Sequence, residues 1–421
     1  MKEVSPLTSI NTTVRIPGSK SITHRAIIAA GLAHGESLLS DFLACEDTLY
    51  TAKTLEALGV AISDENGSLK VRGLGGKFPG DQKEKELYLG NSGTSFRLLL
   101  SVVALATGGF VMTGTPRMQK RPIGTLVKAL TELGAEVSFT TLDGYPPVRI
   151  QAKGIRGGTV HMPGDQSSQF ISSILMSAPY ADKDVEIHVK GTLVSRPYLD
   201  ITTDVMAEFG VAVERDGYSR FKVNSGRIYQ PGQYTIQGDV SSASYFWAAA
   251  AVTGGTVVTE NIHPFQTRQG DIRLLDILEK MGAAVERRSD RVLVHSGTLK
   301  GIEVDMSAMP DMVPTLAAIS LFAKGKTIIK NVPHLRLKES DRLAAVACEW
   351  NKLGARVEEF EDGLVIHGGR KLTGTTVDPH DDHRLAMSMA VIGLRVPGIK
   401  IADEGCVAKS FPQFWDLWDR L

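Results

Sequence analysis

The chain repeats one sequence pattern six times, with a period of about 73 residues. Each copy opens with a polar or charged cluster, continues as a run of small apolar residues, breaks at glycine or at a charged turn, and resumes as a β-branched segment. A fixed period of this length is typical of a repeated supersecondary unit. The six openings are separated by 73, 74, 73, 70 and 71 residues, and they begin at Ser21, Thr94, Ser168, Ser241, Asp311 and Asp382.

Each opening predicts the start of a helix. Ser, Thr and Asp before an apolar run are favoured N-cap residues, because their oxygens accept hydrogen bonds from the free amides of the first turn. Glycine then follows a hydrophobic residue at five equivalent positions, which predicts a helix end followed by a strand. These positions are Leu58-Gly59, Leu133-Gly134, Phe209-Gly210, Met281-Gly282 and Leu353-Gly354. One copy is therefore predicted to be strand, helix, strand, helix and hairpin.

The sixth copy is incomplete, because only 39 residues follow Asp382. We expect residues 411–421 to form its second helix and the N-terminal residues to supply its missing strands. This arrangement predicts an α/β protein with two domains of three repeats each. The first would contain residues 17–238, and the second residues 1–16 together with 239–421.

Composition fits a large cytoplasmic protein. A chain of 421 residues is long enough for two domains that each bury a core. Lys plus Arg and Asp plus Glu both total 47, so no bulk charge favours nucleic acid or an anionic membrane. There is no signal-like N-terminus, no run of 18 apolar residues and no CxxC pair among Cys45, Cys348 and Cys406. We expect a protein that binds neither nucleic acid nor membrane.

Cations gather where three of the six helices are expected to begin. A helix N-terminus carries about half a positive charge, so a cation there costs roughly 0.3–1 kcal/mol unless an anion lies beside it. For one such residue, snorkelling or pairing with a surface carboxylate is at least as good an explanation. Recurrence at equivalent positions favours a polyanionic ligand. The residues are Lys20, His24 and Arg25, then Arg97, then His383 and Arg384.

Three further cationic clusters, at residues 117–122, 337–342 and 409–412, precede or lie beside expected helices. A solvated loop is the ordinary explanation for such runs. The segment 338–342, however, mixes both signs and could supply a carboxylate beside a bound anion, as a general acid requires. Neighbouring cations lower the pKa of such a glutamate unless burial dominates.

Two tempting motifs are weak. Gly18-Ser19-Lys20-Ser21 lacks the earlier glycine of a P-loop. The segment 380–383 has His and Asp residues but no third metal ligand at a compatible spacing. The cysteines have no histidine-rich neighbourhood and are expected in the core or at the surface. We therefore expect no metal site and no cysteine nucleophile.

Eight motifs occur in order over essentially the whole chain, at residues 17–25, 89–97, 121–124, 167–170, 195–198, 338–342, 382–384 and 408–412. Together they closely resemble those of the 5-enolpyruvylshikimate-3-phosphate synthase family of enolpyruvyl transferases. The resemblance implies two inverse α/β, barrel-like domains with the active site in the cleft between them. It also implies transfer of the enolpyruvyl (carboxyvinyl) group of phosphoenolpyruvate to the 5-hydroxyl of shikimate 3-phosphate, in the shikimate pathway to chorismate and aromatic amino acids. No cofactor is implied.

The resemblance also assigns site residues. Those expected to hold shikimate 3-phosphate, mainly from the first domain, are Lys20, Ser21, Arg25, Ser167, Ser168, Gln169, Ser195, Asp311, His334 and Lys338. Those expected to hold phosphoenolpyruvate are Lys20, Asn91, Gly93, Arg121, Gln169, Arg342, Arg384 and Lys409. Asp311 is expected to accept the 5-hydroxyl proton and Glu339 to protonate the enolpyruvyl methylene, with Lys20 and His383 assisting.

Two departures from the family pattern matter. His334 stands where many relatives carry an asparagine that contacts the sugar phosphate, and Leu98 follows Arg97 where plant and enteric enzymes have proline. The second leaves open the degree of inhibition by glyphosate, which occupies the phosphoenolpyruvate site in this family. Gly93 predicts sensitivity, because the absence of a Cβ lets an anion approach the backbone closely.

Two rival functions predict different residues. The enolpyruvyl transferase acting on UDP-N-acetylglucosamine would have Lys-Asn in place of Lys20-Ser21 and a cysteine in the loop before Arg121, and neither occurs. A non-catalytic repeat protein that binds phosphorylated metabolites would keep the cations and lose Asp311 or Glu339, yet both are present. We expect a monomer whose two domains are drawn together by the substrates.

Overall fold

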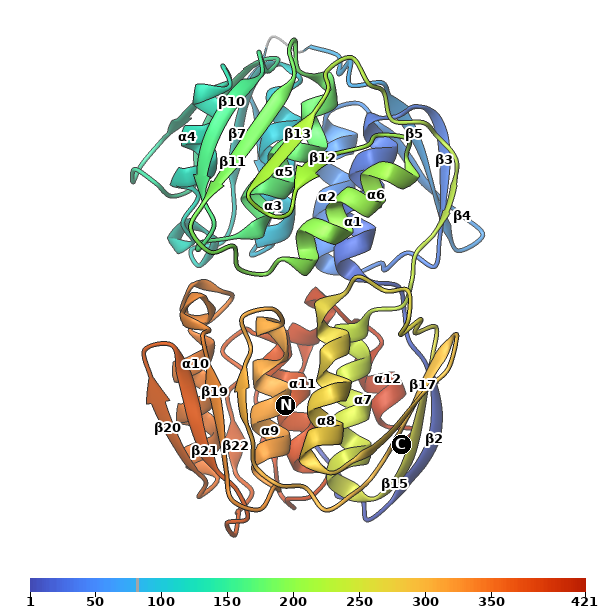
Figure 1. Cartoon of the computed structure of the whole chain (residues 1–421), viewed down its shortest axis with the longest axis vertical. Coiled ribbons are helices and arrows are strands. Elements are labelled where there is room, and N and C mark those ends of the chain that lie inside the picture. Colours follow the sequence, from blue (N-terminus) through green and yellow to red (C-terminus); the bar gives the residue numbers. More distant parts are fainter. Residues whose placement is uncertain (81–82) are drawn as a thin grey trace. The chain divides into compact units, whose positions relative to one another are not determined.

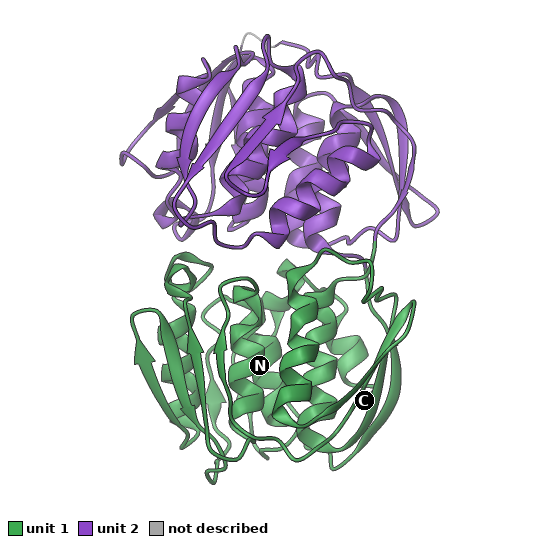
Figure 2. Cartoon of the chain, in the orientation of Figure 1, with its two compact units in different colours: residues 1–17, 237–421 green, residues 18–236 purple. Residues whose placement is uncertain are grey.

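The computed structural model describes residues 1–80 and 83–421, which form two compact units. Unit 1 contains Met1–Pro17 and Gln237–Leu421, and unit 2 contains Gly18–Ile236 (Figure 2). Each unit has its own cluster of buried hydrophobic side chains. Each is therefore described by itself.

The described residues of unit 2 form three four-stranded sheets with one shared pattern. The first two strands of each sheet are parallel, and the later neighbours are antiparallel. In order of pairing, the sheets are β14 (Gln233–Thr235), β3 (His34–Ser40), β5 (Ser68–Leu74) and β4 (Ala61–Glu65); β6 (Lys85–Tyr88), β7 (Thr107–Thr113), β9 (Val148–Lys153) and β8 (Glu136–Phe139); and β10 (Gly158–Pro163), β11 (Val185–Lys190), β13 (Arg220–Val223) and β12 (Glu214–Asp216).

Helices fill the space between these sheets (Figure 1). Three of them are buried almost throughout: α1 (Lys20–Leu32), α3 (Gly93–Ala104) and α5 (Ser168–Ser177). Three more bury one face and expose the other: α2 (Glu46–Ala57), α4 (Gly124–Glu132) and α6 (Pro197–Glu208). Two short 3-10 turns, η1 (Met118–Lys120) and η2 (Ala178–Tyr180), complete the unit.

Unit 1, whose residues are all described, has two sheets of the same pattern and one of three strands. They are β2 (Ile10–Arg15), β15 (Gly255–Glu260), β17 (Arg291–His295) and β16 (Ala284–Arg287); β18 (Glu303–Asp305), β19 (Lys326–Lys330), β21 (Gly363–His367) and β20 (Arg356–Phe360); and β22 (Thr376–Val377), β23 (Lys400–Ile401) and β1 (Lys2–Glu3). The N-terminal β1 pairs antiparallel with β23, in the place that a later hairpin strand fills in the other sheets.

The helices of unit 1 follow the same division. The inner ones are α7 (Val240–Thr253), α9 (Val313–Ser320) and α11 (His383–Gly393), and the outer ones are α8 (Leu274–Met281), α10 (Arg342–Lys352) and α12 (Phe414–Trp418). The 3-10 turns are η3 (Gly270–Arg273), η4 (Pro310–Met312), η5 (Pro333–Leu337) and η6 (Gly405–Lys409). Among the described residues, six sheets and six buried helices thus confirm the α/β class and the sixfold repeat.

The predicted helix ends are confirmed in detail. All five glycines adopt a positive φ that other residues rarely tolerate, and each is followed by a turn into the next strand or extended segment. The values are 99° for Gly59, 92° for Gly134, 82° for Gly210, 114° for Gly282 and 84° for Gly354. The second helix of the sixth repeat is shorter than expected, since α12 spans only Phe414–Trp418.

The predicted N-caps need correction. Only Asp382 caps its helix as expected, accepting a hydrogen bond from the Arg384 amide. In three other repeats the capping side chain lies one or two residues earlier than predicted, at Ser92, Ser167 and Asp239. The physical reason is that each opening holds several consecutive capping-type residues, and the cap is the last residue with an extended backbone.

The remaining two openings are not caps at all. Ser21 lies inside the first turn of α1, which begins at Lys20. Asp311 lies in η4, and its carboxylate contacts arginine side chains rather than the amides of α9. The sequence therefore locates the helix starts to within a turn but not the residue that closes each one.

Candidate active site

In unit 2, α1 carries a fully buried arginine whose partners are all neutral. The Arg25 guanidinium is 1% exposed and donates to Thr202 Oγ1 at 2.7 Å and to the Ser21 carbonyl at 2.8 Å. Further contacts reach the Tyr198 carbonyl at 3.3 Å and Ser172 Oγ at 3.4 Å. Burial lowers the pKa of Arg25 to about 10, which leaves it charged at neutral pH. The neutral acceptors orient this charge without cancelling it.

Lys20, at the first position of α1, has an acidic partner instead. Its Nζ lies 2.9 Å from Oδ2 of Asp47, a carboxylate that is 2% exposed in the first turn of α2. Asp47 was not among the predicted site residues. The sequence does indicate a helix start at this position, because Glu46 and Asp47 form the kind of acidic pair that is favoured in a first helical turn.

The loop that enters α3 packs against Arg121. Nη1 of Arg121 donates to the Asn91 carbonyl at 2.9 Å and to its side-chain oxygen at 3.3 Å. A Cβ on Gly93 would lie 2.4 Å from Nη2 of Arg121 and 2.5 Å from its Cζ. Glycine at position 93 therefore leaves room for the guanidinium itself, and not only for a ligand.

The start of α5 is joined to α3 through Gln169. Its Nε2 donates to Thr94 Oγ1 at 3.0 Å, and its Oε1 accepts from Nη1 of Arg97 at 2.8 Å. Ser167 caps α5, and Ser168 is its first residue. The loop that carries Ser195, which has a φ of 54°, lies beside the loop before α5, because the Val194 amide donates to the Gly164 carbonyl at 2.9 Å.

In unit 1, one buried arginine collects three carboxylates. Nε of Arg342 donates to Asp382 Oδ2 at 2.7 Å, Nη1 to Asp311 Oδ1 at 2.8 Å, and Nη2 to Glu339 Oε2 at 3.0 Å. Arg342 is the first residue of α10 and Asp382 caps α11, so the two helix starts are joined. The surrounding carboxylates raise the pKa of Arg342 despite its burial.

Asp311 contacts three cations. Its Oδ2 accepts from Nη2 of Arg384 at 2.8 Å, and Lys338 Nζ lies 3.6 Å from its Oδ1, in addition to the bond from Arg342. Burial raises the pKa of Asp311, but Arg384, Lys338 and Arg342 together outweigh it and hold the pKa well below its usual range. The carboxylate is therefore ionised throughout the neutral range, as a proton acceptor requires.

Two histidines and a lysine complete the assigned set. His383 is buried at the start of α11, with Nδ1 3.8 Å from Asp382 Oδ1, and Lys409 is buried at the end of η6. His334 lies in η5, where burial, aided by Lys338 and Arg342, lowers its pKa to about 4. A neutral His334 resembles the asparagine of relatives in offering hydrogen bonds rather than charge.

The idea that these cations oppose the helix dipoles holds less well for unit 1. Arg384 lies at the start of α11, yet the Asp382 carboxylate caps the same turn and Asp311 pairs with the guanidinium. Pairing with carboxylates was the alternative explanation from the sequence, although these carboxylates are buried or nearly so rather than on the surface. Cations at helix starts are therefore stronger evidence for a bound anion in unit 2 than in unit 1, where carboxylates already pair with them.

Within residues 1–80 and 83–421, no group of three or more His, Cys, Asp or Glu side chains is arranged to hold a metal ion. The three cysteines are free thiols, and burial followed by the nearby Asp47 raises the pKa of Cys45. No helix in the described part of the chain is long and apolar enough to cross a membrane.

Known proteins resemble this chain over its whole length. The family model of EPSP synthase (3-phosphoshikimate 1-carboxyvinyltransferase) matches residues 4–418. The 3-phosphoshikimate 1-carboxyvinyltransferase of Methanoculleus marisnigri is 50% identical over 401 residues, covering 95% of this chain and 94% of that protein. The enzyme of the same name from Vibrio vulnificus is 44% identical, covering 98% and 97%. The solved structure of EPSP synthase from Acinetobacter baumannii superposes with a TM-score of 0.81 at 31% identity, covering 99% of this chain and 97% of that one.

Proposed function

The chain belongs to the EPSP synthase family, and on that premise we propose that it transfers the enolpyruvyl group of phosphoenolpyruvate to the 5-hydroxyl of shikimate 3-phosphate. The products are 5-enolpyruvylshikimate 3-phosphate and inorganic phosphate. The solved structures of EPSP synthase superpose on this chain with TM-scores of 0.81 and 0.80, which supports the fold of that family.

The observation that carries this proposal is the arrangement around Asp311. The reaction breaks the 5-hydroxyl O–H bond, joins that oxygen to C2 of phosphoenolpyruvate, and breaks the bond from C2 to the phosphate oxygen. The methylene group is CH₂ in both substrate and product, so a proton that it gains must later be removed. Unit 1 offers an ionised acceptor, Asp311, and a second carboxyl group, Glu339, on the same arginine.

Substrate binding would also make Asp311 a better base. Arg342, Arg384 and Lys338 hold its pKa low in the free protein, and a low pKa limits the strength of a base. The carboxylate and phosphate of phosphoenolpyruvate, bound by Arg342, Arg384 and Lys409, would draw part of this positive charge away. The pKa of Asp311 would then rise as the substrate arrives.

We propose that residues 18–236 supply most of the contacts to shikimate 3-phosphate. The residues assigned to this role in unit 2 are Lys20, Ser21, Arg25, Ser167, Ser168, Gln169 and Ser195, and unit 1 would add Asp311, His334 and Lys338. Asn91, Gly93 and Arg121 of unit 2 would contact phosphoenolpyruvate, and Lys20 and Gln169 would contact both substrates. Lys20 and His383 would assist the proton transfers.

A phosphate-release assay tests the function. The purified protein should release phosphate only when both phosphoenolpyruvate and shikimate 3-phosphate are present, and mass spectrometry should detect the enolpyruvyl product. UDP-N-acetylglucosamine in place of shikimate 3-phosphate is the matched control and should give no product. Phosphate release with phosphoenolpyruvate and the nucleotide sugar, but not with shikimate 3-phosphate, would contradict the proposed function and indicate the rival transferase.

We propose in addition that the protein works in the cytoplasm as a monomer and binds no nucleic acid. Equal totals of 47 basic and 47 acidic residues support the last point, since no net charge attracts a polyanion. Analytical ultracentrifugation of the purified protein should give a single species near 45.5 kDa. A stable dimer in that experiment would contradict the monomer.

A further inference from the structure

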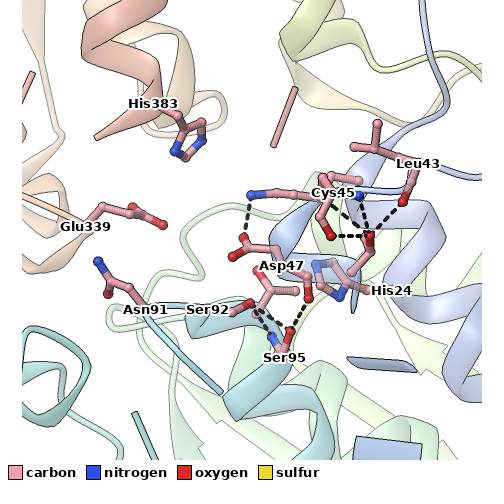
Figure 3. Close-up of polar contacts among 12 residues, drawn as sticks. His24, Leu43, Cys45, Asp47, Asn91, Ser92, Ser95, Glu339 and His383 are labelled. Atoms are coloured by element: carbon pink, nitrogen blue, oxygen red, sulfur yellow. Dashed lines mark hydrogen bonds and ion pairs between the residues drawn. The ribbon is translucent and has the colours of Figure 1, made fainter. Parts of the chain in front are cut away.

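A buried chain of hydrogen bonds joins the N-terminal halves of α1, α2 and α3. Nδ1 of His24 lies 2.7 Å from Thr51 Oγ1, which donates to Ser95 Oγ at 2.9 Å. Ser95 Oγ in turn donates to the Asp47 carbonyl at 2.8 Å. His24, Thr51 and Ser95 are each 0% exposed, and Figure 3 shows His24, Asp47 and Ser95 gathered around this chain.

The direction of every bond in the chain is determined. A hydroxyl has one proton to donate, and Thr51 gives its proton to Ser95 while Ser95 gives its own to the Asp47 carbonyl. Thr51 must then accept from His24, so Nδ1 of His24 carries a hydrogen. Ser92 Oγ, 2.7 Å from Ser95 Oγ, must likewise donate to Ser95. Ser92 Oγ also accepts from the Ser95 amide at 3.3 Å, as the cap of α3.

Both ends of this chain adjoin residues assigned to phosphoenolpyruvate, of which Lys20 is assigned to shikimate 3-phosphate as well. The carboxylate of Asp47 holds Lys20 Nζ at 2.9 Å, and Lys20 lies one helical turn before His24 on α1. At the other end, Ser92 stands between Asn91 and Gly93. Moving any of the three helix starts would therefore shift Lys20 relative to the 91–93 loop.

We propose that Thr51 is a positioning residue whose buried hydroxyl holds Lys20 and the 91–93 loop in register for phosphoenolpyruvate. Thr51 sits on α2, and none of the roles assigned above gives it a substrate contact. The inference rests on the proposed function, because it assumes that Lys20 and the 91–93 loop bind this substrate. A hydroxyl that both accepts and donates inside the protein leaves two unsatisfied groups when it is removed, which makes its loss costly.

Unit 2 offers a matched control that begins at the next residue of α1. Arg25 donates to Thr202 Oγ1 at 2.7 Å, and Thr202 is also 0% exposed. Thr202 bonds to Ser172 Oγ at 2.8 Å and to the Tyr198 carbonyl at 2.8 Å, on α5 and α6, where shikimate 3-phosphate is assigned. Each threonine thus belongs to a buried hydrogen-bond network. The network of Thr51 reaches residues assigned to phosphoenolpyruvate, and that of Thr202 reaches helices assigned to shikimate 3-phosphate.

The test compares the full-length variants Thr51→Val, Thr51→Ser and Thr202→Val by steady-state kinetics for each substrate. Thr51→Val should raise the KM for phosphoenolpyruvate about 5- to 100-fold. The KM for shikimate 3-phosphate should rise clearly less, because Lys20 is assigned to both substrates whereas the 91–93 loop is assigned to phosphoenolpyruvate alone. Thr51→Ser keeps the hydroxyl and should restore most of the affinity. Thr202→Val should show the reverse preference between the substrates. Equal losses for both substrates in Thr51→Val, or failure of serine to restore, would overturn the proposal.

A second measurement does not depend on activity or on the folding of a variant. Nitrogen-15 NMR of the histidine rings in the wild-type protein should show hydrogen on Nδ1 of His24, and an Nδ1 without hydrogen would overturn the proposal. If Thr51→Val fails to fold, Ser95→Ala replaces it in the kinetic test. Its KM should also rise more for phosphoenolpyruvate than for shikimate 3-phosphate. Absence of phosphate release by the wild type would sink the proposed function instead, while the ring measurement would still test the hydrogen-bond chain.

Discussion

The buried arginines of the two units are held in different ways, although Lys20 of unit 2 pairs with the Asp47 carboxylate. In unit 2, Arg25 donates to hydroxyl and carbonyl oxygens, Arg97 to the side chain of Gln169, and Arg121 to Asn91. In unit 1, Arg342 and Arg384 donate to carboxylates of Asp311, Glu339 and Asp382. The arginines near equivalent helix starts are thus surrounded by neutral oxygens in unit 2 and by carboxylates in unit 1.

This difference separates binding from proton transfer. A buried cation with neutral partners keeps its full attraction for an incoming anion, whereas a cation paired with carboxylates attracts a further anion less. The carboxylates of unit 1 therefore weaken anion binding, but they supply groups that accept and donate protons. We infer that unit 2 is built chiefly to hold anions and that unit 1 combines anion binding with the chemistry.

The largest expected effect comes from Asp311→Asn. The change keeps size and hydrogen-bonding capacity but removes the proton acceptor, a contribution of roughly 100- to 10,000-fold in rate. Turnover, measured by phosphate release at saturating substrates, should fall by that amount. The KM values, measured by varying each substrate in turn, should not rise appreciably. A variant that loses affinity and keeps turnover would make Asp311 a binding residue only and would erase the contrast between the units.

The next effect tests whether charge in unit 2 serves binding. Arg25→Met keeps an unbranched side chain in the same space but leaves Thr202, Ser21 and Tyr198 without their donor. Loss of charge-assisted bonds worth roughly 1.5–3 kcal/mol predicts a KM for shikimate 3-phosphate raised about 10- to 150-fold. Calorimetric titration with that substrate is the direct measurement. Arg25→Lys should lie between wild type and Arg25→Met, and an unchanged affinity in both variants would contradict an anion-binding role.

The sequence predicts a good part of this molecule and misses a definite remainder. The period, the glycines at the helix ends and the α/β class follow from local pattern, because a positive φ after a helix is a local requirement. The partners of Arg25 could not be predicted, since Thr202 lies 177 residues away and a buried threonine has no distinctive pattern. The same holds for Asp311 and Asp382 on Arg342, which lie 31 and 40 residues away, whereas Glu339 belongs to the mixed-charge segment 338–342 that the sequence itself indicates.

Gly93→Ala gives a smaller effect and tests crowding in unit 2. The added Cβ would displace the guanidinium of Arg121, which lies 2.4 Å from the ideal Cβ position. Phosphoenolpyruvate should bind more weakly, and glyphosate, the longer ligand of the same site in this family, should lose considerably more. An inhibition series at fixed phosphoenolpyruvate measures both losses.

Gly109→Ala is the control for that series, because its added Cβ would meet Glu84 only at 3.5 Å, an ordinary contact distance. It should leave both ligands unaffected. Equal losses for glyphosate and phosphoenolpyruvate in Gly93→Ala would refute selective crowding, and Arg121 would then be the sole cause of the effect.

The smallest expected effect concerns stability and the carboxylates of unit 1. Asp271 is 4% exposed and accepts a hydrogen bond from Ser241. Burial first, and then the charge of Asp311, raises the pKa of Asp271 to about 6, against the lowering influence of Arg384 and Ser241. A raised pKa means that the folded protein binds this proton more tightly than the unfolded chain does. The resulting stability is present below pH ~4 and is lost as the pH rises through about 6.

Asp271→Asn removes the ionisation and keeps an oxygen for Ser241. Relative to wild type, the variant should gain about 1–1.5 kcal/mol in free energy of unfolding between pH 5 and pH 8, roughly half of the full effect, because the wild type already begins to lose stability above pH ~4. For a unit of this size, the difference in melting temperature between variant and wild type should be about 4 °C larger at pH 8 than at pH 5. Scanning calorimetry at the two pH values measures it, with Asp416→Asn on the exposed face of α12 as the control. The same melting difference at both pH values would show that Asp271 stays ionised in the folded protein. Nearby cations would then neutralise the buried carboxylates of unit 1 more fully than we infer from the comparison with unit 2.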